Sequence, residues 1–264
     1  MTAEEKENKK SISSVEYIRT AFRSSDGLAA LIRNRSRGET IQRITTSARI
    51  VEPAFQEWMH FKNEKESCDI YVGMNTLKPE ARTRTKEDIH TIRHLYLDID
   101  HDGPAALAKI QQSNLVPLPN CAVNTSLDKF QVVWRVEKVS PEQAEVLQRA
   151  MARKFGGDPA ATDSPRLLRL SGFLNRKYGT EFQVQAVKHT ECVFHLQDFR
   201  LRTDPIESDF RPRDHSQTPA SSASRSLSQS EHDWAYAKRA LARGDDPEEV
   251  VRRIADYRGS ERRP

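Results

Sequence analysis

The spacing of apolar and polar positions divides the first part of the chain into predicted helices and strands. Apolar residues recur near helical spacing over 15–33, broken at the sequence SSDG, so this stretch predicts helical structure. β-branched residues alternate in IQRITTSARIV (41–51), which predicts a strand. The sequence PAFQEWMHF (53–61) is typical of a helix with Pro53 at its first position.

The same patterns continue to about residue 190. The apolar runs CDIYVGM and HLYLDID (94–100) predict strands, and DGPAALAKIQQS predicts a helix with Asp102 as its N-cap. CAVNTS and FQVVWRV predict a hairpin, and Ser140 with Gln143 forms the capping box of a further helix. GGDPAATDSPRLLRLSGFLNRK (156–177) has no clean period, whereas FQVQAVKH alternates as a strand. Strands that alternate with helices predict an α/β or α+β fold.

Composition changes at both ends of this region. Residues 1–12 are dominated by charge and are expected to be a disordered tail before a compact domain at 13–202. Residues 203–230 are rich in Ser, Pro and charge, which predicts a flexible linker. Two helices are predicted in 231–264, the second with Asp246 as N-cap and Pro247 at its first position. Because two short helices bury little core, we expect this helical segment to be incomplete.

Composition and charge limit the possible partners and cellular compartment of the protein. The chain has 264 residues, of which 36% are hydrophobic and 30% charged, and its net charge of +4 permits a polyanionic partner. Its three cysteines have neither a disulfide framework nor a zinc spacing, which favours a reducing compartment. There is no apolar run near the ~18 residues of a membrane span, and the charged N-terminus is unlike a signal peptide. We therefore expect a soluble, cytoplasmic protein that makes no membrane contact.

Candidate chemistry begins with Asp98 and Asp100, which share one face of a predicted strand. Two ionised carboxylates this close repel unless a cation or a proton lies between them. The pattern copies the start of an EF-hand loop, but Lys109 stands where that loop needs a bidentate Glu. The acids could instead cap the next helix, which explains Asp102 but not Asp98 inside an apolar run. The remaining interpretation is a divalent metal site.

Two other segments could hold a triphosphate beside such a site. Around the predicted hairpin, Lys129 and Gln131 share a strand face near Ser126, so a cation and a donor could converge on phosphate. An ordinary hairpin with a solvated polar face has the same pattern. The irregular segment 156–177 interleaves acids, glycines and cations, although a cationic run is most often solvated. Its polar candidates are Asp158, Asp163, Arg166, Arg169, Asn175, Arg176 and Lys177.

These motifs together resemble the archaeo-eukaryotic primase (primase-polymerase) superfamily, most closely its RepB-like DNA primase branch, over about residues 40–190. LYLDID is similar to that family's hydrophobic-DxD strand, and DKFQVVW to its second motif, with Gln131 in the place of a His. RLLRLSGFLNRK is similar to the last segment, with Ser171 where the family usually has Pro. The third metal carboxylate lies at Asp158, which has the family's distance from Arg169, or at Asp163, which could instead order the loop through Arg166.

The resemblance implies an α/β fold in which an RRM-like sheet carries the site. It implies attack of a 3′-hydroxyl on the α-phosphate of a nucleoside triphosphate, templated by single-stranded DNA, with Mg²⁺ or Mn²⁺ as cofactor. A helicase or another replication protein would be a partner, in replication of a plasmid or mobile element. The implied catalytic residues are Asp98, Asp100, Asp158 and Asp163, of which Asp98, Asp100 and Asp158 bind metal. The implied nucleotide-binding residues are Ser126, Lys129, Gln131, Arg166, Arg169, Asn175 and Lys177.

Two other function classes stay open. A catalytically weak DNA-binding module that recruits replication proteins would explain the departures at Gln131 and Ser171. Such a module has no need of Asp98 and Asp100, which repel DNA phosphates when no metal is bound. A metal-dependent nuclease would use similar carboxylates, but RLLRLSGFLNRK favours triphosphate use. A relaxase is disfavoured because the sequence has no His-x-His pair.

Overall fold

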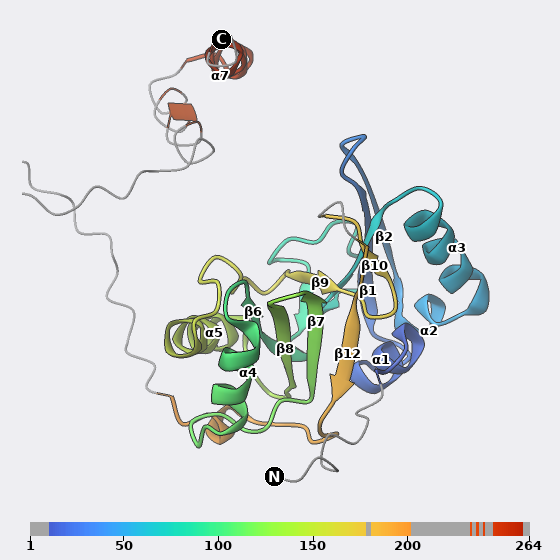
Figure 1. Ribbon diagram of the computed structural model, residues 1–264, viewed down its shortest axis with the longest axis vertical. Helices are drawn as coiled ribbons and strands as arrows, with labels where there is room; N and C mark the ends of the chain where they lie inside the picture. Colours follow the sequence, from blue (N-terminus) through green and yellow to red (C-terminus); the bar gives the residue numbers. More distant parts are fainter. Residues whose placement is uncertain are drawn as a thin grey trace, which may run out of the picture. The chain divides into compact units, whose positions relative to one another are not determined.

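The computed structural model describes residues 11–177, 181–201 and 245–260, together with Asp233, Tyr236, Ala237 and Ala240 (Figure 1). The chain divides into two compact units, Met1–Glu207 and Ser208–Pro264. None of the helices that the structure describes is both long and apolar enough to cross a membrane.

A four-stranded antiparallel sheet, here the central sheet, lies in the middle of the first unit. Its strands, in spatial order, are β12 (Gln185–Lys188), β7 (Cys121–Ser126), β8 (Lys129–Arg135) and β6 (His94–Ile99). Helices α4 (Gly103–Gln111) and α5 (Pro141–Phe155) cover one face of it (Figure 1). Side chains alternate along β6, so Leu95 and Leu97 join the hydrophobic cluster of these helices. Tyr96 lies in the other cluster, on the opposite face.

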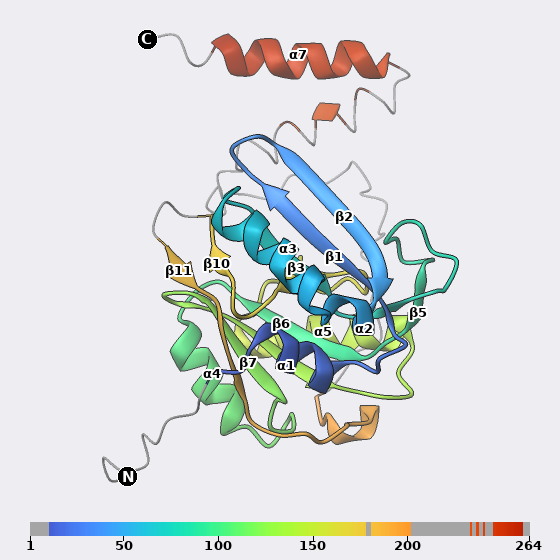
Figure 2. The same cartoon turned by 90° about the vertical axis from the view of Figure 1, so that its right-hand side faces the viewer.

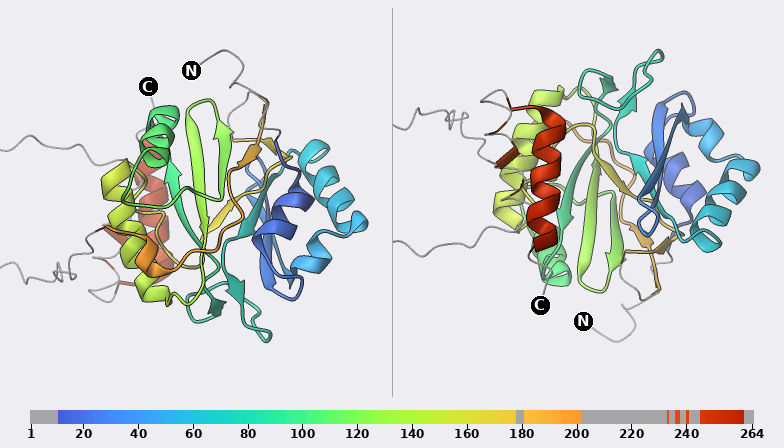
Figure 3. Two further views of the ribbon diagram at one scale, coloured as in Figure 1. Left: turned by 90° about the horizontal axis from the view of Figure 1, so that it is seen from below. Right: turned by 90° about the horizontal axis from the view of Figure 1, so that it is seen from above.

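A second sheet, here the outer sheet, lies opposite that face of the central sheet (Figure 3). Its strands are β1 (Gly27–Asn34), β2 (Glu39–Thr46), β3 (Asp69–Gly73), β4 (Thr76–Leu77), β5 (Ile89–Thr91) and β9 (Leu167–Arg169). Helices α1 (Ser14–Ala21), α2 (Ser47–Ile50) and α3 (Pro53–Glu64) pack with it. Figure 3 shows the resulting layers, with helices outside both sheets. Side chains from both sheets meet between them, since Gln131 Oε1 on β8 accepts the N–H of Arg169 on β9 (3.0 Å).

Smaller elements complete the description. Strands β10 (Leu174–Asn175) and β11 (Phe182–Gln183) form a two-stranded ribbon, and a 3₁₀ helix covers Leu196–Asp198. In the second unit, α7 (Pro247–Ser260) begins as predicted, because Asp246 Oδ1 accepts the N–H groups of Glu248 (2.9 Å) and Glu249 (3.1 Å). The predicted linker 203–230 lies outside the described residues.

Most predicted elements are confirmed, including the strands of CDIYVGM and HLYLDID, the hairpin and the capping box of α5. The prediction of helical structure over 15–33 is wrong in its second half, where residues 27–34 form β1. Leu28, Ala30 and Ile32 are buried, and β1 pairs with β2 along one edge and with β3 and β4 along the other. Pairing on both edges outweighs the local helical spacing.

Three local predictions are also corrected. The strand predicted over 41–51 ends at Thr46, whose Oγ1 accepts the N–H of Arg49 (3.2 Å) and starts α2. Asp102 precedes α4 but has a left-handed backbone (φ 50°), and its side chain makes no capping hydrogen bond. The prediction of disorder over 1–12 is wrong at Ile12, because its N–H donates to Ala186 O (2.9 Å) and its side chain is buried. Residues 1–10 lie outside the described residues.

Candidate active site

The candidate site lies where β6 ends. Asp98 is partly buried on the β6 face that carries Tyr96, and its register partner on β8 is Gln131. Asp100 follows β6 on the same side of the chain and is partly exposed. The DxD motif therefore faces the space between the two sheets rather than the core beneath α4 and α5.

The chain after α5 brings Asp158 to the same place. The N–H of Asp158 donates to Asp98 O (2.8 Å), and its own Oδ1 accepts the N–H of Ala160 (2.9 Å). This approach depends on Gly157, because a Cβ there would lie 2.2 Å from Leu97 Cδ2. A glycine after the helix thus holds Asp158 against β6.

Burial and the neighbouring carboxylates both disfavour the charged form of Asp98. Burial raises the pKa of Asp98 to about 6, and the negative charges of Asp100 and Asp158 act in the same direction. A hydrogen bond from the Gln131 side chain and the charge of Arg166 oppose the rise without cancelling it. Asp98, Asp100 and Asp158 therefore form an under-neutralised acidic group, which a cation would stabilise.

The oxygen donors of this group suit a hard divalent cation such as Mg²⁺ or Mn²⁺. Among the described residues, no three His, Cys, Asp or Glu side chains are already arranged around a metal position. Asp100 Oδ1 instead lies 2.7 Å from Lys129 Nζ. Asp163 forms an ion pair with Arg166.

Gln131, predicted to bind nucleotide, connects the two sheets. Its buried side chain hydrogen-bonds to Asp98, and its Oε1 accepts the N–H of Arg169 on β9 (3.0 Å). At the end of the hairpin, Ser126 is the register partner of Lys129. Lys129 and Gln131 thus share a face beside the acids, as the sequence predicts.

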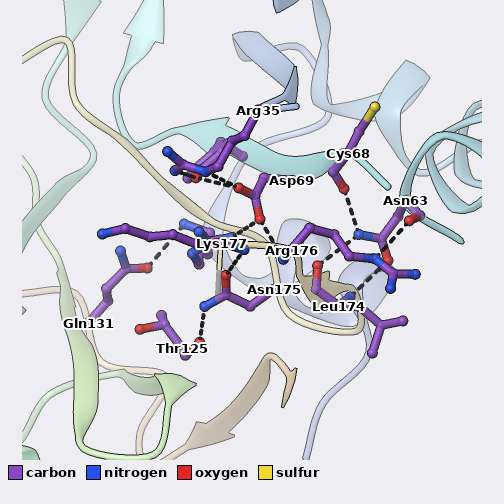
Figure 4. A network of polar contacts seen from close by, with 12 residues as sticks. Arg35, Asn63, Cys68, Asp69, Thr125, Gln131, Leu174, Asn175, Arg176 and Lys177 are labelled. Carbon is purple, nitrogen blue, oxygen red and sulfur yellow. Dashed lines mark hydrogen bonds and ion pairs between the residues drawn. The ribbon is translucent and has the colours of Figure 1, made fainter. Parts of the chain in front are cut away.

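The predicted nucleotide-binding residue Arg169 lies in a buried network centred on Asp69 (Figure 4). Arg169 Nη1 is 2.6 Å from Asp69 Oδ1, and Arg35 Nε is 2.7 Å from Asp69 Oδ2. The N–H of Arg176 donates to Oδ1 at 2.8 Å. Burial alone would raise the pKa of Asp69, but Arg169 and Arg35 hold it below its ordinary value. The sequence reasoning missed Asp69, although a lone acid at the start of the apolar run CDIYVGM is a signal.

Asn175 and Lys177 lie at the edge of the same network (Figure 4). The Asn175 side chain is buried; it donates to Thr125 O (2.6 Å) and accepts the N–H of Lys177 (3.0 Å). Lys177 is exposed. Arg169 and Asn175 are thus engaged within the fold, whereas the acidic group, Lys129 and Gln131 meet at one end of the central sheet.

Comparison with known proteins agrees with this fold. The family model for the RepB DNA-primase N-terminal domain matches residues 36–195. A Replication protein of Clostridium perfringens is 26% identical over 190 residues, which is 64% of this chain and 44% of that protein. This chain therefore spans less than half of that relative's length.

Two solved structures share the architecture. The crystal structure of primase RepB′ matches with a TM-score of 0.50 and 20% identity, over 67% of this chain and 56% of that one. The AEP domain of the cyanophage S-2L primase-polymerase matches with a TM-score of 0.54 and 13% identity, over 70% and 94% of the two chains. The predicted archaeo-eukaryotic primase-like fold and the RepB-like resemblance are confirmed.

Proposed function

Since the chain belongs to the RepB DNA-primase N-terminal domain family, we propose that it is a DNA primase or primase-polymerase. It synthesises primers on single-stranded DNA from nucleoside triphosphates, by metal-dependent nucleotidyl transfer, in the replication of a plasmid or mobile element. The observation that carries this proposal is the acidic group, in which two neighbouring carboxylates add to the raised pKa of Asp98. A cytoplasmic location and a helicase partner stay predictions.

In this proposal Asp98, Asp100 and Asp158 hold Mg²⁺ or Mn²⁺. Bound divalent ions would activate the attacking 3′-hydroxyl and neutralise charge on the triphosphate. The chain supplies the ligand positions: β6 carries Asp98 and Asp100, and the Asp158 N–H holds its loop 2.8 Å from Asp98 O. Gln131 orients Asp98 through its side-chain hydrogen bond. Asp163, already paired with Arg166, orders the loop instead of binding metal.

The nucleotide-binding roles divide into two groups. Lys129 places a positive charge beside the acids, and Ser126 lies opposite it at the open end of the hairpin. Arg166 acts electrostatically on Asp98 and so lies near the same group. Arg169 and Asn175 are better explained as positioning residues, since their side chains hold β9 and β10 in place. In this scheme Lys177, Lys129 and Arg166 contact the triphosphate.

The test is primer synthesis on single-stranded DNA with labelled nucleotides and Mg²⁺ or Mn²⁺. The double variant Asp98→Ala, Asp100→Ala should make no product, yet bind single-stranded DNA as tightly as the wild type or slightly more so. Removing two negative charges relieves repulsion of phosphate but also removes the metal ligands. The matched control, Glu57→Ala with Glu64→Ala on α3, removes two exposed acids and should retain activity.

One observation favours a recruitment module instead. Gln131 carries no charge and is buried between Asp98 and Arg169, where the family resemblance leads us to expect a His. If the wild type binds DNA but makes no product with either metal, the primase proposal fails and the recruitment module leads. Equal activity of the double variant and the wild type would also overturn it.

A further inference from the structure

A groove of about 990 Å³ opens on the outer sheet. Its walls come from the turn before β1, the end of β2, the strands β4 and β5, and the loop that joins β4 to β5. Along the outer sheet, β1 and β4 lie between β2 and β5, both of which are labelled in Figure 2. Small-molecule pockets of such a size, about 300–1,000 Å³, are mostly apolar. This groove differs from them, because Arg, Lys and Thr dominate its lining.

The charge of the lining is almost all positive. Arg23, Arg43, Lys78 and Arg82 are exposed in the groove. Among the described lining residues the one carboxylate is Asp26, which Arg93 neutralises through two bonds of 2.9 and 3.0 Å. Within the described part of the chain, neither Arg23 nor Arg82 forms an ion pair. Cations without carboxylate partners attract a polyanion.

The uncharged lining points to phosphate rather than to bases. Thr45, Thr46 and Thr91 contribute hydroxyl groups that can donate hydrogen bonds to phosphate oxygens. No Phe, Tyr or Trp occurs among the lining residues that the structure describes, so it has no aromatic surface on which bases would stack. A ligand held here would be recognised mainly through its sugar-phosphate backbone.

The groove is connected to the candidate active site through the loop of residues 78–88. Lys78 and Arg82 line the groove, whereas the Arg84 guanidinium donates to Pro165 O and interacts with the charges of Asp163 and Arg166. The Nε atoms of Arg84 and Arg166 are buried without a hydrogen-bond partner in the described structure. Positive groups therefore continue from the groove to Arg166, which acts on Asp98.

We propose that this groove binds the backbone of a single-stranded polynucleotide and directs it past Arg84 to the acidic group. The strand is the template, an assignment that rests on the proposed primase function. Binding is independent of base sequence and depends on salt, because cations and hydroxyl groups make the contacts.

The experiment measures fluorescence anisotropy of labelled oligothymidylate with the full chain, without nucleotides or metal, at several salt concentrations. The double variant Arg23→Gln, Arg82→Gln should bind at least about tenfold more weakly near 0.1 M salt. Its slope of log affinity against log salt should be shallower by about 1.4, since each phosphate contact on a single strand contributes about 0.7. The control Lys65→Gln, Arg200→Gln removes two exposed cations that do not line the groove, and should stay within about twofold of wild type. Thermal unfolding verifies that both variants fold.

Each outcome decides the proposal. Equal binding of oligothymidylate by the groove variant and the wild type overturns it, as does an equal loss in the control. An oligouridylate arm shows whether the groove distinguishes DNA from RNA, and groove-dependent binding of either strand supports the proposal. Primer synthesis is measured separately. A wild type that binds through the groove but makes no primer refutes the primase function and the template role, and leaves the strand-binding groove in place.

Discussion

Asp69 and Asp98 are two strand aspartates whose side chains face the space between the two sheets, yet their electrostatics are opposite. Asp69 has no solvent exposure, and its pKa lies below the ordinary value. Asp98 is more exposed, and its pKa is raised to about 6. Burial alone therefore does not decide whether the pKa of a carboxyl group is raised or lowered.

The charged and hydrogen-bonding groups around each aspartate decide the direction of its pKa shift. Two arginines and a backbone N–H surround Asp69, so its charge is matched within the fold. Asp98 has two further carboxylates close by, and a hydrogen bond from Gln131 and the charge of Arg166 oppose their effect without cancelling it. A fold that leaves such a group under-neutralised sacrifices stability at that position, which is common where ligands bind. Asp69 therefore stabilises the contacts among β3, β9 and Arg35, whereas the charge of Asp98 is not compensated to the same extent.

The largest expected effect comes from Asp69→Asn. The change removes the counterion of Arg169, whose side chain is 8% exposed, so a buried charge is left unpaired. Breaking such a pair costs on the order of 3–5 kcal/mol. Urea unfolding measures the loss. The control Glu181→Gln breaks the pair with Arg176, in which the glutamate is 69% exposed, and should cost at most about 1 kcal/mol. Equal losses in the two variants would contradict the structural role of Asp69.

Asp98→Asn should raise the free energy of unfolding, whereas Asp69→Asn lowers it. The folded pKa of about 6 exceeds the ordinary value of 3.8, so ionisation of Asp98 destabilises the folded state as pH rises from about 4 to about 6. At pH 8 without divalent ions the variant should be more stable than wild type, by up to about 3 kcal/mol. The difference should vanish as the pH falls to about 4.

The measurement is the difference in unfolding free energy between wild type and Asp98→Asn across this pH range. Burial lowers the pKa of His94 to about 4, so the folded protein loses stability as the pH falls below about 6.5. This contribution is the same in both proteins and cancels in the difference. A difference independent of pH, or a variant less stable than wild type at pH 8, would mean that Asp98 is adequately neutralised.

The smallest effect is expected for Gln131→Leu. The change leaves the N–H of Arg169 without its acceptor and should cost about 1–2 kcal/mol. Because Gln131 lowers the folded pKa of Asp98, the stabilisation by Asp98→Asn should keep growing to a higher pH in the Gln131→Leu background, while its onset near pH 4 stays unchanged. Gln185→Leu, at an exposed position of β12, serves as control and should change stability by no more than about 0.5 kcal/mol. If the upper end of this pH range stays the same, Gln131 does not affect the ionisation of Asp98.

Helices and strands with local sequence patterns could be predicted from the sequence alone. The alternation of HLYLDID predicts the strand and the shared face of Asp98 and Asp100, and Ser140 with Gln143 predicts the start of α5. These signals suffice because they depend on residues within one turn or one strand. The family motifs, which are also local in sequence, led to the correct fold.

Contacts between residues far apart in the sequence could be identified only in the folded structure. The stretch 27–34 is a strand because β2, β3 and β4 pair with it, although its spacing is helical. The pairing of Asp69 with Arg169 joins residues 100 positions apart in the chain. The N–H of Asp158 reaches Asp98 O (2.8 Å), whereas Asp163 forms an ion pair with Arg166, and the sequence shows neither contact. Charge compensation depends on distance in space, and one-dimensional patterns do not contain that distance.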